Sequence, residues 1–471
     1  MVRKAISKYY LFLLALYGAL LLLPLFLKII GPHAPSEMIP SLPLLLLWIV
    51  PIFFLSRICN IFNQTFGLAW ALWFVVGSVN LIASYDYYGE SYRLNADTPA
   101  LIYILFLSAI LAGIYLAERN SNRDKHRDDQ NLRFQSLTPY FSSVLLIFPF
   151  IWFGSLVLSL GYVPILRAWE GENVVLSMYA LDYGPLYGYM LVNSLSLLMA
   201  FAKFYIKKGT ARYFYLCLII VFAFFVIASG KRHIIILSML SILAYLFYTK
   251  RITVSQALSF FIIIGGLYMG LEILRQGSEA TKFSSFTRKF LTIGHEYRAF
   301  AYVVNHLKPG EIAGYNWAAS TLAAAVNEGV LLAIGFDKNA LIQMSSAYAW
   351  RYIFYSEFGI RSNLTAELYM AYGWAGMPLA FIFGMVVGWI SKWITMTRSR
   401  DNLIFLCVAY ATLMLTLVDS FNDVVGSLTL LFYVWVINRL IRLFVFGLLP
   451  SRSRWVYRAA QAGSDAANDG F

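Results

Sequence analysis

The first candidate site is a tight turn with two adjacent basic residues, which could bind phosphate. Residues 229–233 read Ser-Gly-Lys-Arg-His and join two apolar segments. A glycine allows a close backbone approach to an anion, and adjacent Lys and Arg side chains neutralise phosphate oxygens. Lys231 and Arg232 could therefore hold a phosphate ligand, or they could reach only the phosphates of membrane lipids. Arg275 follows another apolar segment and could reach the same layer.

A second group of polar residues follows a helical spacing. Apolar residues recur every three or four positions over residues 283–307, which predicts an amphipathic helix lying at a membrane interface. The opposite face of this helix carries Arg288, His295 and Arg298, and Glu296 lies at its flank. These side chains could bind an anion or move a proton, and they could equally form a solvated helix face.

An acid lies where another apolar segment begins. Glu367, Tyr369 and Gly373 belong to the run 362–376, which leads into that segment. A carboxyl group at the mouth of a membrane helix is costly unless it has partners. Glu367 could accept a proton or form an ion pair with Arg361. Tyr369 could belong to the aromatic belt of any membrane protein.

The composition indicates that membrane helices position these residues. Hydrophobic residues make up 60% of the chain, aromatic residues 17% and charged residues only 13%. A soluble domain carries about 25% charged residues. Apolar blocks of about 20 residues are long enough to cross a bilayer as helices. We expect an all-α polytopic membrane protein of about twelve spans, near 9–30, 38–56, 66–85, 98–117, 139–160, 184–202, 213–229, 234–249, 254–273, 371–391, 402–420 and 424–445.

The distribution of Lys and Arg predicts the orientation of these spans. Most of them gather in alternate connections, which places both termini in the cytoplasm. The expected parts are helices 1–9 in 1–273, a long periplasmic loop with amphipathic helices in 274–370, helices 10–12 in 371–445, and a partly disordered cytoplasmic tail in 446–471.

The stretch 317–336 is apolar enough to resemble a further span. Asn327, Glu328 and Gly329 lie at its centre, where polar groups are costly in hydrocarbon. A crossing there would also place the later basic clusters on the wrong side. We therefore expect this stretch to lie on the outer membrane surface or to dip into it.

Charge and cysteine content exclude several classes of protein. The net charge of +13 could suggest nucleic acid, but the basic residues lie in connections between apolar blocks and are better explained by membrane orientation. The three cysteines, Cys59, Cys217 and Cys407, give neither a disulfide framework nor the spacing of metal ligands. We expect no metal and no cofactor.

With these features the chain resembles the bacterial O-antigen polymerases, the Wzy family, which join lipid-linked oligosaccharide repeat units. The resemblance covers most of the chain as architecture. Two motifs sharpen it: a small-Gly-basic-Arg turn at 229–232 and an acid-aromatic-glycine helix start at 367–376. Some family members have two long outer loops, and here the segment 161–183 is much shorter than the loop 274–370.

The resemblance implies a membrane glycosyltransferase of polysaccharide and lipopolysaccharide biosynthesis in the bacterial inner membrane. It would transfer the growing glycan from undecaprenyl pyrophosphate to a sugar hydroxyl of the next lipid-linked unit, beside a chain-length regulator protein. Stabilising the pyrophosphate leaving group should matter most. The implied base is Glu367, His295 or Glu296. The implied ligands of pyrophosphate or sugar are Lys231, Arg232, Arg275, Arg288, Arg298, Arg361 and Tyr369.

Two other functions suit the same architecture. A ligase that moves finished polysaccharide onto the lipid A core would share the fold and the donor. A flippase of the lipid-linked oligosaccharide would also have twelve spans, but transporters place charged residues deep within their spans. The apolar blocks here are nearly free of charge, and a loop of this length favours surface chemistry.

Overall fold

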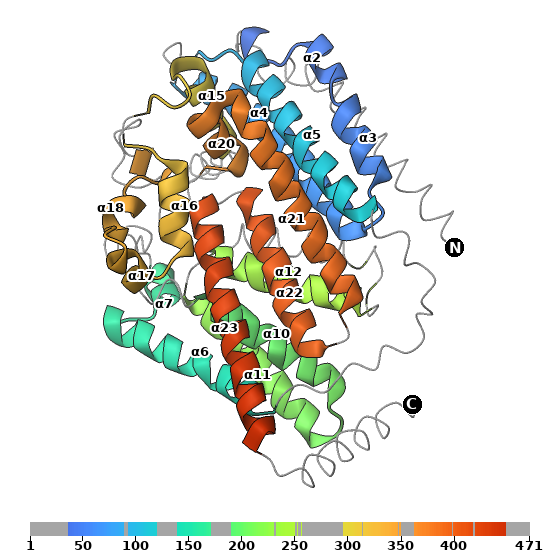
Figure 1. The fold of residues 1–471 in the computed structure, drawn as a ribbon, viewed down its shortest axis with the longest axis vertical. Helices are drawn as coiled ribbons and strands as arrows, with labels where there is room; N and C mark the ends of the chain where they lie inside the picture. The colour runs from blue at the N-terminus through green and yellow to red at the C-terminus, as the bar shows by residue number, and fades with distance from the viewer. Residues whose placement is uncertain are drawn as a thin grey trace. The chain divides into compact units, whose positions relative to one another are not determined.

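The computed structural model describes residues 36–88, 93–119, 139–170, 190–229, 232–249, 252, 256, 295–312, 314–346, 348–349, 362–397, 399–417 and 420–448. Every regular element within these residues is a helix (Figure 1). Within the described part of the chain, six helical stretches are long and apolar enough to cross a membrane, which supports the expected all-α membrane protein. They are Phe62–Ile82, Asp97–Arg119, Thr210–Ala228, Leu364–Met396, Arg400–Leu417 and Phe421–Ile441.

Twelve spans and cytoplasmic termini stay predictions. The expected spans 9–30 and 254–273 lie outside the described residues, as do residues 449–471 of the expected tail. The remaining expected spans each coincide with helical structure, although two of these helices, Met190–Ile206 and Arg232–Tyr248, have only 17 residues each.

The chain folds into two compact units. The first contains Met1–Arg127, Lys282–Lys392 and Leu413–Val425, and the second contains Asp128–Thr281, Trp393–Thr412 and Gly426–Phe471. The described helices of the first unit are η1 (Ser36–Met38), α2 (Leu42–Leu46), α3 (Ile49–Arg57), α4 (Ile61–Tyr88), α5 (Asp97–Arg119), α15 (His295–His306), α16 (Trp317–Ala325), α17 (Glu328–Ala333), α18 (Lys338–Ile342), α20 (Leu364–Tyr372), η6 (Gly373–Gly376), most of α21 (Met377–Met396), η7 (Leu415–Leu417) and the start of α23 (Phe421–Leu448).

The second unit holds the remaining described helices. They are α6 (Pro139–Leu160), α7 (Pro164–Trp169), α10 (Met190–Ile206), α11 (Thr210–Ala228), α12 (Arg232–Tyr248), most of α22 (Arg400–Met414) and the rest of α23. Helix α10 packs against α6, α11 and α12. Phe153 of α6 stacks on Phe225 of α11 with ring centroids 4.4 Å apart, and the buried hydroxyls of Ser194 and Ser238 lie 2.8 Å apart between α10 and α12.

The expected span at 38–56 is bent. Helical residues 36–46 and 49–57 meet at 50°. Pro43 and Pro51 each lie in the first turn of a helix, where the missing N–H removes no intrahelical hydrogen bond. Each proline thus favours a new helix start, and the chain bends between the two.

Glycines bring α5 and α21 into backbone contact. Gly113 of α5 lies against the backbone of Phe381 and Met385, and Gly384 of α21 lies against the backbone of Ile110. A methyl group at either glycine would collide with main-chain atoms. Small residues spaced in this way allow membrane helices to approach closely, as the ribbons of α5 and α21 show (Figure 1).

Helix α15 packs its apolar face into the core of the first unit. It contacts α4 and α5, and Tyr297 and Phe300 are fully buried. The Tyr297 ring lies against Gly77 of α4, where a Cβ atom would overlap it. The other face is more open, because Arg298 and Tyr302 are half-buried and His306 is exposed. Residues 295–306 therefore form a helix with one apolar and one polar face, and its position at a membrane interface stays a prediction. Residues 283–294 of that expected helix lie outside the described residues.

The stretch 317–336 does not form a continuous span, as expected. Asn327 accepts a hydrogen bond from the Gly329 N–H and so caps a new helix, which separates α16 from α17. Asp337 likewise caps α18. Helix α16 has nine residues and α17 six, so each is far shorter than the roughly 20 residues that a crossing needs.

Replacing Gly384 by Ala should destabilise the protein. The added methyl group meets the Ile110 backbone, and overpacking of this kind costs about 1–3 kcal/mol. Gly154→Ala is the matched control, because no atom lies within 4 Å of a Cβ at Gly154. Thermal midpoints in detergent should fall for Gly384→Ala and should hold or rise for Gly154→Ala. Equal midpoints for the two variants would contradict the backbone contact.

Candidate functional site

Glu367 is placed by a short capped helix. The Asn363 side chain accepts a hydrogen bond from the Ala366 N–H at 2.9 Å, which starts α20 and puts Glu367 in its first turn. Gly373 ends α20 with a φ of 56°, a conformation that favours glycine. The 3-10 turn η6 then redirects the chain into α21. The expected span at 371–391 is thus a separate helix that begins at Met377.

The Glu367 carboxylate is fully buried and surrounded by hydrogen-bond donors. Ser346 Oγ donates at 2.6 Å and Ser362 Oγ at 2.9 Å, both to Oε1. The backbone N–H of Phe421, at the start of α23, lies 3.3 Å from Oε1 and 3.2 Å from Oε2. Ser420 supplies a further side-chain hydrogen bond. A carboxylate at a helix N-terminus is also favoured by the helix dipole.

Tyr315 reinforces the same cluster from another segment. Its hydroxyl donates to the Glu367 carbonyl oxygen at 3.0 Å. Burial raises the pKa of the Tyr315 phenol well above its usual value, and the nearby Glu367 carboxylate raises it further. The phenol therefore stays protonated and remains a donor at physiological pH.

This arrangement orders the chain around Glu367. The carboxylate joins Ser346, Ser362 and the start of α23, which are far apart in the sequence. Hydrogen bonds to a charged group contribute about 1.5–3 kcal/mol each. Because the side chain is 0% exposed, its oxygens face protein donors and do not face solvent. Glu367 holds structure in place and is closed to a direct contact with a ligand from solution.

Aromatic rings continue from the carboxylate to the surface. The Phe421 ring stacks on Trp317, with centroids 5.2 Å apart and an interplanar angle of 22°. Trp317 meets Tyr372 edge to face at 5.9 Å, and Tyr369 meets Trp374 at 6.3 Å. Tyr372 and Trp374 are exposed. We call Trp317, Tyr369, Tyr372, Trp374 and Phe421 the Trp317 cluster.

Three more of the expected site residues are described: Tyr369 lies on α20, and Glu296 and Arg298 lie on α15. Tyr369 is buried, and its ring meets Phe300 of α15 edge to face at 6.1 Å. Glu296 is buried and Arg298 is half-buried, both on α15. Glu296 lies on a helix that contacts α4, α5 and α20.

The other expected site residues cannot be placed beside Glu367. His295 begins α15 and Arg232 begins α12, but the side chains of both lie outside the described part of the structure. Lys231, Arg275, Arg288 and Arg361 lie outside the described residues altogether, so the expected ion pair of Arg361 with Glu367 stays a prediction. Among the described residues, no three His, Cys, Asp or Glu side chains gather as metal ligands.

Several partners of Glu367 have weak sequence signals or none. The Ser362-Asn363 pair before an apolar run is a helix-cap signal that could have been used for Ser362. Ser346 and Phe421 lie 21 and 54 residues from Glu367, and no short motif links them to it.

No protein-family model, curated protein or solved structure matches this chain.

Glu367→Ala should destabilise the protein more than Glu367→Gln. Alanine leaves Ser346, Ser362 and the Phe421 N–H without their acceptor, at about 1–3 kcal/mol for each buried donor. Glutamine keeps one acceptor oxygen but turns an NH2 group toward donors. Thermal midpoints should therefore fall in the order wild type, Gln, Ala.

Glu311→Ala is the control for this series. The Glu311 side chain is 67% exposed and lies 4.0 Å from Lys308, so its loss should leave the midpoint unchanged. A Glu367→Ala midpoint equal to that of the control would contradict the buried network.

Proposed function

We propose that this chain is a polymerase of lipid-linked oligosaccharide repeat units in the bacterial inner membrane. In the reaction, the bond between the anomeric carbon of the growing glycan and the oxygen of undecaprenyl pyrophosphate breaks. A hydroxyl oxygen of the next lipid-linked unit forms the new glycosidic bond. The hydroxyl proton passes to a base, and undecaprenyl pyrophosphate leaves with the electron pair.

The observation that supports this proposal best is the Glu367 network beside an exposed aromatic surface. The network fixes Ser346, Ser362 and α20 to the start of the long apolar helix α23. A rigid group of polar side chains at the end of membrane helices suits chemistry at a membrane surface. A transporter would more typically carry its buried charges near the middle of its spans.

The exposed rings of the Trp317 cluster supply a surface for sugar. Tyr372, the last residue of α20, and Trp374, in η6, are 38% and 44% exposed just before α21 begins. The apolar faces of sugar rings pack on aromatic side chains, and neighbouring polar groups bind their hydroxyls. Thr321 and Asn422, hydrogen-bonded at 3.0 Å, are such groups beside Trp317.

Within this proposal, Lys231, Arg232 and Arg275 neutralise the pyrophosphate, and Arg288, Arg298 and Arg361 bind pyrophosphate or acidic sugars. Glu367 acts as a positioning residue, because its carboxylate is enclosed. Proton removal then falls to His295, since Glu296 is buried as well. The proposal also includes twelve spans with both ends in the cytoplasm. The active face lies in the periplasm, and a chain-length regulator is the partner.

Deleting the gene should leave lipopolysaccharide core capped by a single repeat unit. Gel electrophoresis of the surface polysaccharide reads this directly. Core without any repeat would indicate a ligase, and repeats retained inside the cell would indicate a flippase; either result contradicts a polymerase.

Arg232→Ala in a complemented strain should shorten the glycan, and normal chain length at normal protein level would remove Arg232 from the mechanism.

Trp374→Ala should shorten the polysaccharide in the complemented strain, because it removes an exposed ring from the proposed sugar surface. Trp393→Ala is the matched control: Trp393 is also exposed but belongs to the other end of α21. Both proteins should reach wild-type abundance on immunoblots. Equal chain lengths for the two variants would contradict a sugar contact at Trp374.

A further inference from the structure

Residues 316–346 form a helical hairpin with a small core of its own. The Asn316 N–H donates to the Met344 carbonyl at 2.9 Å and closes the base. Helices α16 and α18 pack against each other, and α17 packs against α18. Ala323, Leu331 and Leu341, one from each helix, are buried together. The hairpin therefore has its own hydrophobic interior, which is separate from the apolar side chains on its outer surface.

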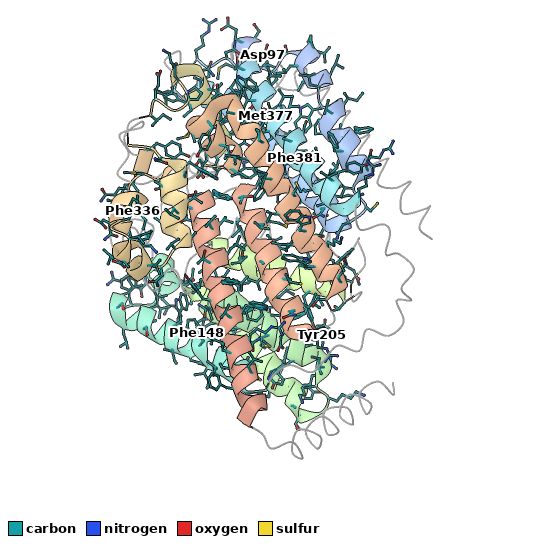
Figure 2. All side chains as sticks on the ribbon, in the orientation of Figure 1. Asp97, Phe148, Tyr205, Phe336, Met377 and Phe381 are labelled. Carbon is teal, nitrogen blue, oxygen red and sulfur yellow. The ribbon has the colours of Figure 1, made fainter. Side chains whose placement is uncertain are left out.

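The tip of this hairpin exposes a patch of large apolar side chains. Val330, Leu332, Ile334 and Phe336 are 54%, 60%, 60% and 47% exposed, whereas Leu331 between them is fully buried. Figure 2 labels Phe336 beside α17 and α18. Transfer of apolar surface from water to hydrocarbon is favourable by about 25 cal/mol per Å². Four such side chains in a seven-residue stretch therefore favour a hydrocarbon surrounding. We call these four residues the α17 patch.

The base of the hairpin is fixed to the start of a membrane-crossing helix. Trp317 stacks on Phe421, and Thr321 Oγ1 donates to Asn422 Oδ1 at 3.0 Å. Ser346, at the other end of the hairpin, donates to Glu367, which binds the Phe421 N–H. Phe421 is the first residue of a stretch long and apolar enough to span the bilayer. The base of the hairpin is therefore held at the boundary of a stretch with the length and composition of a membrane span.

Charged residues limit how deep the tip can reach. Glu328 and Asp337 are exposed at the two ends of the segment that carries the patch. An acidic side chain at the bilayer centre costs about 2.5–3.5 kcal/mol. Helix α16 spans about 14 Å, close to the thickness of one leaflet, so full insertion would carry both acids toward the centre. Shallow insertion leaves both at the headgroups.

We propose that the α17 patch inserts into the acyl-chain region of the leaflet in which α23 begins, with Glu328 and Asp337 at headgroup level. The occupant of the patch is lipid acyl chain. The hairpin acts as a second membrane anchor, which holds the Glu367 network at the membrane surface. This inference does not depend on the proposed function.

Fluorescence quenching by spin-labelled lipids tests the insertion. Cys59, Cys217 and Cys407 are replaced by Ser, a single Cys is introduced by Leu332→Cys, and the thiol is labelled with an environment-sensitive fluorophore. The full chain is placed in vesicles of phosphatidylethanolamine and phosphatidylglycerol. A nitroxide near the headgroup end of the acyl chain should remove most of the emission, and a nitroxide at the far end should remove less. Glu311→Cys, at an exposed site outside the hairpin, should be quenched by aqueous iodide and not by either lipid.

The other outcomes overturn the proposal in different ways. Stronger quenching by the deep nitroxide would mean a hairpin that enters to mid-bilayer. Quenching by iodide alone would mean a patch in water, and no quenching by lipid or iodide would mean a patch covered by protein, such as a second copy of this chain. Val330→Cys, on the same patch, repeats the measurement in case the Leu332→Cys protein does not fold.

Discussion

A buried carboxylate requires hydrogen-bond donors around its oxygens. The donors that surround Glu367 come from several segments of the first unit and hold these segments together. Desolvating a carboxylate is costly, and removing one partner from a buried charged group costs about 3–5 kcal/mol. Glu367 meets this requirement with Ser346, Ser362 and the Phe421 N–H. These groups come from the end of the α16–α18 hairpin, from the cap of α20 and from the start of α23. One side chain thus joins three segments and fixes the base of the hairpin and the Trp317 cluster to membrane helices.

Close backbone contacts provide the rigid support behind that network. Gly113 and Gly384 let α5 and α21 touch through their main chains, and Gly77 lets the Tyr297 ring enter between α4 and α5. Tyr297 in turn positions α15, whose Phe300 meets Tyr369 of α20. In a membrane, lipid tails are as apolar as the helix surfaces, so the hydrophobic effect does not drive helices together. Close packing and interhelical hydrogen bonds hold them together instead. The glycine contacts of α4, α5 and α21 and the polar network at α20 are therefore linked through α15.

Sequence reasoning reached the helices more easily than the site. Apolar blocks of span length identify α4, α5, α11 and α23, because bilayer thickness sets a simple length rule. Asn327 and Glu328 at the centre of an apolar stretch correctly predicted that 317–336 is not a continuous span. The same reasoning identified Glu367 as an acid that needs partners but offered Arg361, since an adjacent cation is visible in sequence. Ser346 and Phe421 were missed because their proximity depends on tertiary packing. The place of the Tyr297 ring was missed for the same reason: the space beside Gly77 has no periodicity to reveal it.

Hydrogen–deuterium exchange of Glu367→Gln in lipid nanodiscs tests most directly whether this carboxylate ties the hairpin to the membrane helices. The glutamine keeps the size of the side chain and removes its charge. The account predicts faster exchange at residues 315–346 and at the start of α23 than in wild type, with α10, α11 and α12 unchanged. Exchange at 315–346 that matches wild type would contradict the central role of Glu367.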